Sequence, residues 1–315
     1  MITTGTKQEE ERLAKRIREV EKQIGNTPVR QVSPELYDVP CVSIYAKMEW
    51  MQLGGSIKAR AAYSIIRNAI DKHQLNEKTI LLDATSGNTG IAYAAIAREI
   101  GLKVSLCLPE NASLERKEIL TSLGVDIIYT SPLEGTDGSQ QVAQDLVNKE
   151  PGKYFYADQY KNENNWKAHY NTTAFEILEQ VPNITHFVAG LGTTGTFVGT
   201  GRRLRELRPD VQLIALQPDS ALHGLEGWKH LPTAVVPKIY DDTVADEVLE
   251  VTTEQAYAML KKVHDVEGLL LSPSSAANVV GSIMIAERIK KGTIVTVLPD
   301  NADKYSEVIK KLIKK

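Results

Sequence analysis

Two spacings of apolar residues alternate along most of the chain. Short continuous apolar runs are typical of buried strands, and apolar residues at every third or fourth position are typical of helices. From residue 79 onward the two kinds follow one another regularly, which is the pattern of β-α-β units around a parallel sheet. Strands are expected at 29–32, 41–46, 79–84, 104–108, 126–129, 154–156, 186–189, 212–217 and 293–298. Helices are expected at 8–24, 58–73, 89–100, 113–123, 138–149, 164–180, 196–207, 253–267 and 275–290, with one more at the C-terminus.

The alternation restarts after residue 153, and this predicts two α/β domains with a cleft between them. One stretch, 218–242, has no clear period. Because long irregular segments are uncommon in compact domains unless they are functional, it is the longest candidate for a functional loop.

The composition narrows the class of protein. The chain has 315 residues, 42% hydrophobic and 24% charged, with a formal net charge of -3, so a nucleic-acid partner is not expected. No apolar run reaches membrane-spanning length and the N-terminus is polar, so neither a membrane span nor a signal peptide is expected. Cys41 and Cys107 both lie in strand-like runs, which predicts buried, reduced thiols and a cytoplasmic protein. No metal site is predicted.

A lysine at the start of a predicted helix is the first candidate for chemistry. Lys58 follows Gly54, Gly55 and Ser56, whose small side chains leave room for a bulky group near the backbone. The ordinary interpretation of a lysine is a solvated surface cation. Two Gly/Thr/Ser loops elsewhere in the chain favour a different interpretation of Lys58. A lysine together with two loops that can bind anions indicates a phosphate-bearing aldehyde cofactor held as a Schiff base.

The first loop runs from Gly190 to Thr196, between a predicted strand and a predicted helix. Its glycines permit close backbone approach, and the N–H groups and dipole of the helix start favour a phosphate. A plain strand–helix turn is the alternative. The loop lacks the lysine of a P-loop, and neither the third glycine nor the acidic residue of a dinucleotide-binding fold is present.

The second loop, Thr85-Ser86-Gly87-Asn88-Thr89-Gly90, is richer in hydroxyls. Thr85, Ser86 and Thr89 are candidates to hold a carboxylate, and Asn88 is a candidate to present its amide to a phenolic oxygen. A capped helix start is the alternative. The same alternative is the stronger interpretation of a third segment, Ser272 to Ala277, when it is taken alone.

Together these segments carry a resemblance to a known family. The chain resembles the cysteine synthase / cystathionine β-synthase family of pyridoxal-phosphate (PLP) enzymes, with the tryptophan-synthase-β-like fold, along almost its whole length. In this order and at these intervals the motifs are highly specific, and the likeness is greatest to the CysM type. The motifs are Gly25-Asn26-Thr27-Pro28, Ser56-Ile57-Lys58, the 85–90 loop, Gln159 with His169-Tyr170, the 190–196 loop and the Ser274 segment.

The resemblance implies a fold and a reaction. The fold is the two-domain PLP fold type II, each domain a mostly parallel sheet flanked by helices, with the active site in the cleft between them. Residues 47–153 form the smaller domain with the substrate-carboxylate loop, and 1–46 with 154–315 form the larger PLP-binding domain. The reaction is β-replacement on O-acetylserine or O-phosphoserine by a sulfur nucleophile, giving L-cysteine through a Lys58 aldimine and an aminoacrylate. The sulfur donor is sulfide or a thiocarboxylated carrier protein, and a homodimer is expected.

The resemblance also assigns roles to residues. Lys58 is the catalytic lysine, Asn88 contacts the phenolic oxygen and Ser274 faces the pyridine nitrogen. The phosphate is cradled by Gly192, Thr193, Thr194, Gly195 and Thr196. The substrate α-carboxylate is held by Thr85, Ser86, Gly87, Thr89 and Gln159.

Two features of the sequence leave alternatives for the substrate and the reaction. Family members usually carry Asn-Pro shortly before the lysine and Asp directly after it, whereas this chain has Gln52-Leu53 and Ala59. In phosphoserine-using relatives an arginine in the 218–242 segment meets the leaving phosphate; here the nearest cation is Lys229, with His223 and His230 close by in sequence. A synthase using a nitrogen nucleophile, a serine or threonine dehydratase, and a PLP-binding protein without turnover are the alternatives.

Overall fold

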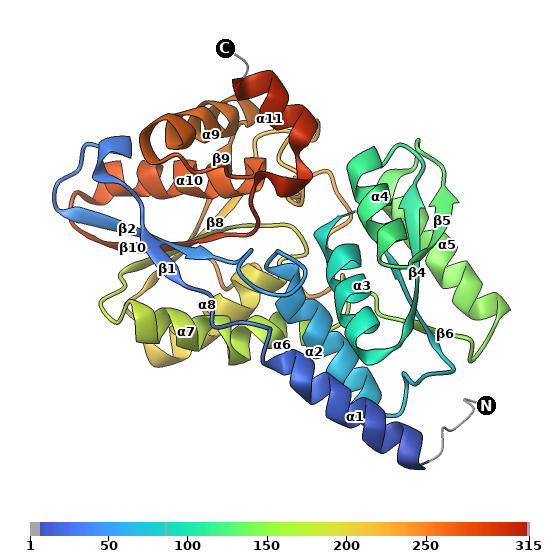
Figure 1. Ribbon diagram of the computed structural model, residues 1–315. Helices are drawn as coiled ribbons and strands as arrows, with labels where there is room; N and C mark the ends of the chain where they lie inside the picture. Colours follow the sequence, from blue (N-terminus) through green and yellow to red (C-terminus); the bar gives the residue numbers. More distant parts are fainter. Residues whose placement is uncertain (1–6, 86, 314–315) are drawn as a thin grey trace. The chain divides into compact units, whose positions relative to one another are not determined.

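The computed structural model describes residues 7–85 and 87–313, which fall into two compact α/β units. The first unit comprises residues 1–25 and 52–165, and the second comprises residues 26–51 and 166–315. Each unit has its own sheet (Figure 1). The predicted α/β class, with mostly parallel sheets flanked by helices, is confirmed. No helix in the described ranges combines the length and hydrophobicity of a membrane span.

The first unit is built on a fully parallel sheet with the strand order β5-β4-β3-β6. Its strands are β3 (Ile80–Ala84), β4 (Lys103–Pro109), β5 (Asp126–Thr130) and β6 (Tyr154–Tyr156). Its helices are α1 (Lys7–Glu21), α2 (Lys58–Asp71), α3 (Asn88–Ile100), α4 (Leu114–Ser122) and α5 (Gly135–Lys149).

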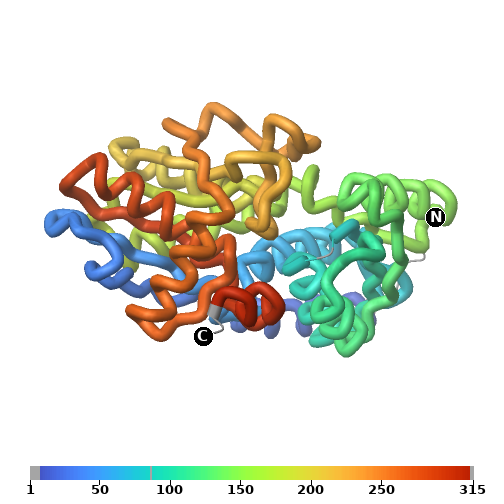
Figure 2. The backbone as a smooth tube through the Cα atoms, turned by 90° about the horizontal axis from the view of Figure 1, so that it is seen from above, coloured from blue at the N-terminus to red at the C-terminus, as the bar shows by residue number. Residues whose placement is uncertain are grey.

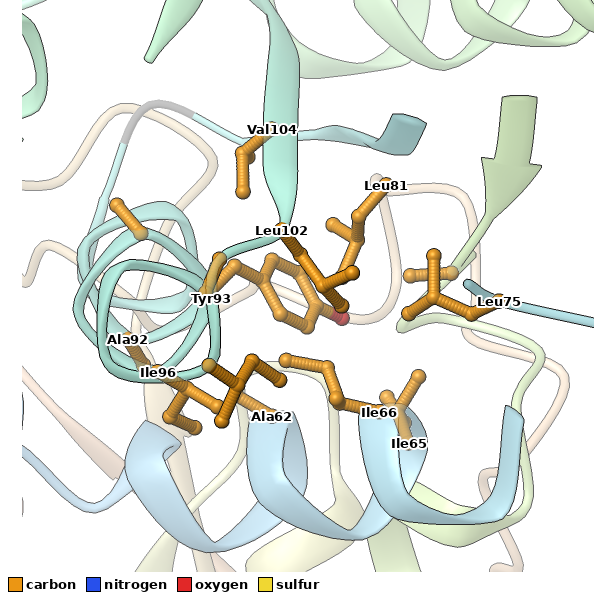
Figure 3. Close-up of a cluster of buried hydrophobic side chains, with 14 of the residues drawn as sticks. Ala62, Ile65, Ile66, Leu75, Leu81, Ala92, Tyr93, Ile96, Leu102 and Val104 are labelled. Atoms are coloured by element: carbon orange, nitrogen blue, oxygen red, sulfur yellow. The ribbon is translucent and has the colours of Figure 1, made fainter. Parts of the chain in front are cut away.

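Strand β3 shows how its sequence supports helices on both faces of this sheet. Because successive side chains of a strand point to opposite faces, Leu81 belongs to one apolar cluster and Leu82 and Ala84 to another. Figure 3 shows the first cluster, in which Tyr93 of α3 lies near Leu81 and above the apolar side chains of α2. The second cluster contains Ala143 of α5. The carboxyl end of β3, where the 85–90 loop begins, is therefore anchored from both faces.

The second unit contains a sheet with the order β1-β2-β10-β7-β8-β9, in which only the β1–β2 pair is antiparallel. Figure 2 shows the blue β1–β2 segment beside the red C-terminal part of the chain, as the pairing of β2 with β10 requires. The strands are β1 (Val29–Gln31), β2 (Val42–Met48), β7 (His186–Gly190), β8 (Gln212–Pro218), β9 (Glu247–Val251) and β10 (Gly292–Leu298). The helices are α6 (Asn164–Asn171, whose first two residues group with the first unit), α7 (Thr173–Gln180), α8 (Gly195–Leu207), α9 (Thr253–Glu267), α10 (Pro273–Ile289) and α11 (Ser306–Ile313), with short 3-10 turns at Pro34–Leu36 and Ala302–Lys304.

A buried ion pair ties the Gly25–Pro28 motif to the second unit. Lys47 of β2 is fully buried, and its Nζ lies 2.7 Å from Glu176 Oε2 and donates to the Thr27 carbonyl at 2.7 Å and to Gln180 Oε1 at 2.9 Å. A buried charge is tolerated when it is paired and its remaining hydrogen-bonding capacity is satisfied, as it is here. The motif therefore has a structural role in joining β2 to α7.

Three sequence predictions differ from the structure. Strand β9 was not expected, because it is an edge strand with an alternating half-exposed pattern next to the irregular segment. The expected helix 164–180 is two helices, since Thr172 has φ -130° and ψ -66° and breaks the α-helical path. Of the two thiols predicted to be buried, Cys107 is buried but Cys41 is exposed, because it lies in the turn before β2.

The division into units also differs from the expected boundaries at residues 47 and 153. Residues 1–25 group with the first unit, because α1 packs against α2 and α3. Residues 154–165 group with it as well, because β6 pairs with β3. Residues 47–51 group with the second unit as the continuation of β2.

Candidate active site

Lys58 is the first residue of α2. The chain reaches it through Gly54 and Gly55, both with positive φ (79° and 62°). A Cβ on Gly54 would lie 3.2 Å from the Cα of Ala92 in α3, so the glycine permits a close approach to that helix. Behind the lysine, the apolar face of α2 is buried, and this fixes the helix start that carries Lys58.

The sequence departs from the family pattern at Gln52-Leu53 and at Ala59, and the structure shows what Gln52 and Ala59 contact. The side-chain oxygen of Gln52 accepts a hydrogen bond from the Gly25 N–H at 3.0 Å, which ties the approach to Lys58 to the end of the N-terminal segment. Ala59 is fully buried and brings no charge next to the lysine.

The 85–90 loop joins β3 to α3. Thr85 is buried; its N–H donates to the Cys107 carbonyl at 3.1 Å, and its Oγ1 accepts from the Gly87 N–H at 3.3 Å. Helix α3 starts at Asn88, and its N-cap residue, Gly87, cannot offer a capping side chain. An anion can take the place of a cap at such a helix start. Ser86 lies outside the described residues.

Two of the expected carboxylate-binding residues meet in the first unit. Thr89 donates from its hydroxyl to Gln159 Oε1 at 2.7 Å, and both side chains are buried. Asn165 fixes the same segment, because its Nδ2 donates to the Gln159 carbonyl at 2.8 Å. Thr85, Gly87, Asn88, Thr89 and Gln159 thus belong to one end of one unit, although 70 residues separate Thr89 from Gln159.

The 190–196 loop, in the second unit, joins β7 to α8. Its Thr194 is the N-cap residue of α8 and has φ 72°, a left-handed conformation that disfavours β-branched residues. The side chain makes no capping hydrogen bond, and its Oγ1 is buried without a hydrogen-bond partner among the described residues. Strained residues with an unsatisfied buried hydroxyl are typical of ligand sites.

The glycines of this loop are packed against the following segment. A Cβ on Gly192 would come within 2.0 Å of the Gly227 carbonyl oxygen, and one on Gly190 within 2.0 Å of the Trp228 ring. The Lys229 N–H donates to the Leu191 carbonyl at 2.8 Å, and the Lys229 side chain is partly exposed. The irregular segment expected at 218–242 therefore lies directly over the loop.

Three contacts to this loop were not assigned from the sequence. Asn278 of α10 is fully buried; it accepts from the Gly190 N–H at 2.9 Å and donates to the Val297 carbonyl at 2.9 Å. His169 Nε2 lies 3.2 Å from Thr196 Oγ1, and Trp228 covers Gly190. Only His169 had a sequence signal, as part of a family motif. Nothing in a lone Asn or Trp indicates which loop it will contact.

Ser274 lies in the first turn of α10 and is buried. The helix starts two residues earlier than expected, with Ser272 as N-cap accepting from the Ser275 N–H. Ser272 Oγ also lies 3.2 Å from Ser274 Oγ, so it fixes the Ser274 hydroxyl.

The charge near Lys229 is smaller than the sequence indicated. Burial lowers the pKa of His223, and His230 lowers it further, while Asp219 opposes the shift. His223 also accepts a hydrogen bond from the Leu225 N–H at its Nδ1. It therefore adds little positive charge near neutral pH.

The described residues fit a PLP phosphate. Helix α8 has no side-chain cap, Thr194 holds a buried hydroxyl without a partner in the described chain, and Gly192 lets the loop pack against the Gly227 carbonyl. These are the donors and the bare backbone that a phosphate needs at a helix start.

Comparison with known proteins supports this interpretation. The family model described as pyridoxal-phosphate dependent enzyme matches residues 20–300. The chain is 43% identical over 293 residues to the cysteine synthase of Aquifex aeolicus, covering 90% of this chain and 89% of the relative. It is 38% identical over 297 residues to the O-acetylserine dependent cystathionine beta-synthase of Bacillus subtilis, covering 92% and 96%.

Among solved structures, O-ureido-L-serine synthase matches with a TM-score of 0.86 and 29% identity, covering 94% of this chain and 96% of that one. The resemblance inferred from the sequence motifs is confirmed by the family match and the two relatives. The chain therefore belongs to the family of pyridoxal-phosphate dependent enzymes, within its cysteine synthase group.

Proposed function

We propose that this chain catalyses PLP-dependent β-replacement on an O-activated L-serine, with a sulfur nucleophile, to form L-cysteine. The observation that carries the proposal is the uncapped start of α8, where Thr194 holds a strained backbone and a buried hydroxyl in a loop that fits a phosphate. The 43% identity to a cysteine synthase supports the same reaction.

Each unit carries some of the residues to which the proposal gives a role. In the second unit, residues 192–196 hold the cofactor phosphate and Ser274 faces the pyridine nitrogen. In the first unit, Asn88 contacts the phenolic oxygen. Thr85, Ser86, Gly87, Thr89 and Gln159 hold the substrate carboxylate.

The bound cofactor supplies an electron sink for the bonds that break at the substrate's Cα and Cβ. Lys58 would hold the cofactor through its amine, and the same amine would take the Cα proton and hold it at Nζ. Ser274 would offer the cofactor's ring nitrogen a neutral hydroxyl, where a carboxylate would stabilise a positive charge. A neutral partner would favour loss of the β-substituent over transamination.

The proposal also names the substrate and the partners. O-acetylserine is the favoured donor, and the name of the Bacillus subtilis relative supports it. O-phosphoserine is accepted if Lys229 neutralises the leaving phosphate. Sulfide or a thiocarboxylated carrier protein supplies the sulfur, and the active form is a homodimer. A cytoplasmic location agrees with the absence of a disulfide at Cys41 and Cys107.

Reductive labelling tests the site. Borohydride treatment of the holoenzyme, followed by peptide mapping, should place the cofactor on Lys58. Lys58→Ala keeps the buried face of α2 and should lose the label. A label on another lysine would remove the assignment of Lys58. Cysteine formation from O-acetylserine and sulfide, followed by product analysis, tests the reaction itself.

The role of Lys229 is tested by comparing the two donors. Lys229→Ala should lower kcat/KM for O-phosphoserine by about 10- to 100-fold, the range for loss of a charge-assisted contact, and change that for O-acetylserine little. Lys238→Ala, at an exposed position of the same segment, is the matched control. Equal losses with both donors would show that Lys229 does not contact the phosphate.

A second candidate function is β-replacement with a different nucleophile. The match to a protein named O-ureido-L-serine synthase favours it, because that name denotes a product other than cysteine. Incubation with O-acetylserine and a mixture of sulfur, nitrogen and oxygen nucleophiles distinguishes the two. Cysteine as the dominant product supports the first candidate, and a product with nitrogen or oxygen bonded to Cβ supports the second.

A further inference from the structure

An amide side chain lies between the ends of two neighbouring strands in the second unit. Asn278 of α10 is fully buried. Its Oδ1 accepts a hydrogen bond from the Gly190 N–H at 2.9 Å, and its Nδ2 donates to the Val297 carbonyl at 2.9 Å. Gly190 is the last residue of β7, and Val297 is the last but one of β10. The carboxamide therefore joins the carboxyl ends of both strands, where the 190–196 loop begins.

The register of the sheet shows which bond the amide replaces. Strands β7 and β10 run parallel and are paired up to Val188. The Leu191 N–H donates to a carbonyl of β8, and neighbouring N–H groups of a strand point to opposite sides, so the Gly190 N–H points toward β10. In a continued ladder it would bond directly to the Val297 carbonyl, although Pro299 could not return the next bond because it has no N–H. Instead the side-chain amide is inserted between the two groups, and the strand ends are held farther apart than ladder pairing would hold them.

The first turn of α10 holds the segment that follows β10. Ser275 Oγ donates to the Asp300 carbonyl at 2.6 Å, and Ser272 Oγ donates to the same carbonyl at 3.2 Å. One helix thus holds both segments that leave the separated strand ends: the segment after β10 through its first turn, and the 190–196 loop through Asn278. Ligands of α/β sheets bind at the carboxyl ends of the strands, so these segments lie where a ligand site is expected.

The same helix carries Ser274, to which the proposed function gives the contact with the cofactor's pyridine nitrogen. Ser274 and Asn278 are four residues apart, and residues at this spacing lie on one face of a helix. Gly190 is also packed against Trp228, since an added Cβ would lie 2.0 Å from the Trp228 ring. The start of the phosphate loop is therefore held relative to Ser274 by one helix, through Asn278.

We propose that Asn278 is a positioning residue, whose inserted carboxamide sets the spacing between the 190–196 loop and Ser274 so that the two hold opposite ends of one PLP molecule. The ring nitrogen and the phosphate of PLP are separated by a rigid ring and a short arm, so the ligand cannot adapt to a change in this spacing. The assignment of the two ends rests on the proposed function; the amide bridge between β7 and β10 does not.

Comparison of three ligands separates this role from a purely structural one. PLP contacts both the loop and Ser274, pyridoxal lacks the phosphate, and inorganic phosphate contacts the loop alone. Asn278→Leu keeps the approximate size of the side chain and removes both hydrogen bonds. The full-length protein is freed of cofactor and titrated with each ligand. The Kd for PLP should rise about tenfold, while the Kd for pyridoxal and the Kd for phosphate should each change by less than about twofold.

Thr296→Val is the matched control. Thr296 of β10 is fully buried, and its Oγ1 donates to the Val188 carbonyl at 2.7 Å, within the paired part of the ladder. This variant also loses a buried hydrogen bond, so it should lower the stability of the fold and leave all three Kd values within about twofold of the parent. The proposal is overturned if this control reproduces the effect of Asn278→Leu, or if Asn278→Leu weakens all three ligands alike or none. Loss of phosphate binding in parallel with PLP would also overturn it, because the loop itself would then be damaged.

A second variant keeps the proposal testable if Asn278→Leu does not fold. Asn278→Gln retains the amide and lengthens the side chain by one methylene, so PLP should bind about threefold more weakly, with pyridoxal and phosphate unaffected. An unchanged Kd for PLP in this variant would contradict the fixed spacing. A parent protein that binds PLP no more tightly than pyridoxal would contradict the phosphate loop, and with it the proposed function. A parent that shows the expected ligand pattern but forms no cysteine would contradict only the proposed reaction.

Discussion

The turn from β3 to α3 and the turn from β7 to α8 have similar sequences but different surroundings. In both, glycine and threonine precede a helix that begins without a side-chain cap. At Gly87 an added Cβ would meet nothing within 4 Å, and the backbone has an ordinary negative φ. At Gly192 the added Cβ would lie 2.0 Å from a backbone oxygen, and the neighbouring Thr194 is in the left-handed region.

The difference separates two uses of glycine in an anion-binding loop. In the β7–α8 turn, glycine lets the protein's own chain pack closely, so the loop is fixed by contacts within the second unit. In the β3–α3 turn, Gly87 serves no packing purpose within the described chain, so its small size serves access to the helix start. A rigid loop suits a resident cofactor phosphate, and an accessible one suits a substrate that enters and leaves.

Gly192→Ala should give the largest effect. The new Cβ must displace the Gly227 carbonyl, which belongs to backbone and has no flexible side chain to move. We expect a loss of about 3 kcal/mol in the free energy of unfolding, at the upper end for overpacking, together with loss of bound PLP. Denaturant unfolding and the cofactor absorbance measure the two effects. A stable variant with full cofactor content would show that the loop is not rigid.

Thr194→Gly should have a smaller effect, which raises the stability of the apoprotein and lowers the affinity for PLP. Glycine relieves the left-handed backbone strain, so the apoprotein should gain about 0.5–1 kcal/mol after the entropy of the new glycine is subtracted. The affinity for PLP should fall about tenfold, because a hydroxyl donor to the phosphate is lost. Thr194→Ser retains the hydroxyl and is the control. Unchanged PLP affinity in the glycine variant would mean that Thr194 does not bind the phosphate.

The sequence predicted the parts of the fold that follow from periodicity. Helix 253–267 has the same bounds in sequence and structure, because its apolar spacing is regular and Thr252 and Gln255 form a capping box. Strand β9 could not be predicted, because an edge strand shows only a weak alternation. The break at Thr172 could not be predicted either, because residues 164–180 contain no glycine or proline that would mark the end of a helix.

The candidate site was predictable only in part. The motifs identified the loops, since glycine, threonine and serine between a strand and a helix have a local cause. Asn278 and Trp228, which contact the 190–196 loop, come from distant parts of the second unit's sequence. Their roles depend on strand register and packing, which a single sequence does not specify.

Gly87→Ala should have the smallest effect on stability and still impair function. Alanine fits the negative φ and the open space, so the free energy of unfolding should change by less than about 0.5 kcal/mol, with a small gain from reduced chain entropy. The methyl group nevertheless restricts access to the start of α3. KM for O-acetylserine should therefore rise several-fold, while PLP content stays full.

Gly227→Ala is the control that separates access from backbone strain. Gly227 also has open space around it, but its φ is 88°, so this variant should lose stability instead. If Gly87→Ala left KM unchanged, the β3–α3 turn would not be the place where the substrate carboxylate binds, and the contrast between the two turns would reduce to packing alone.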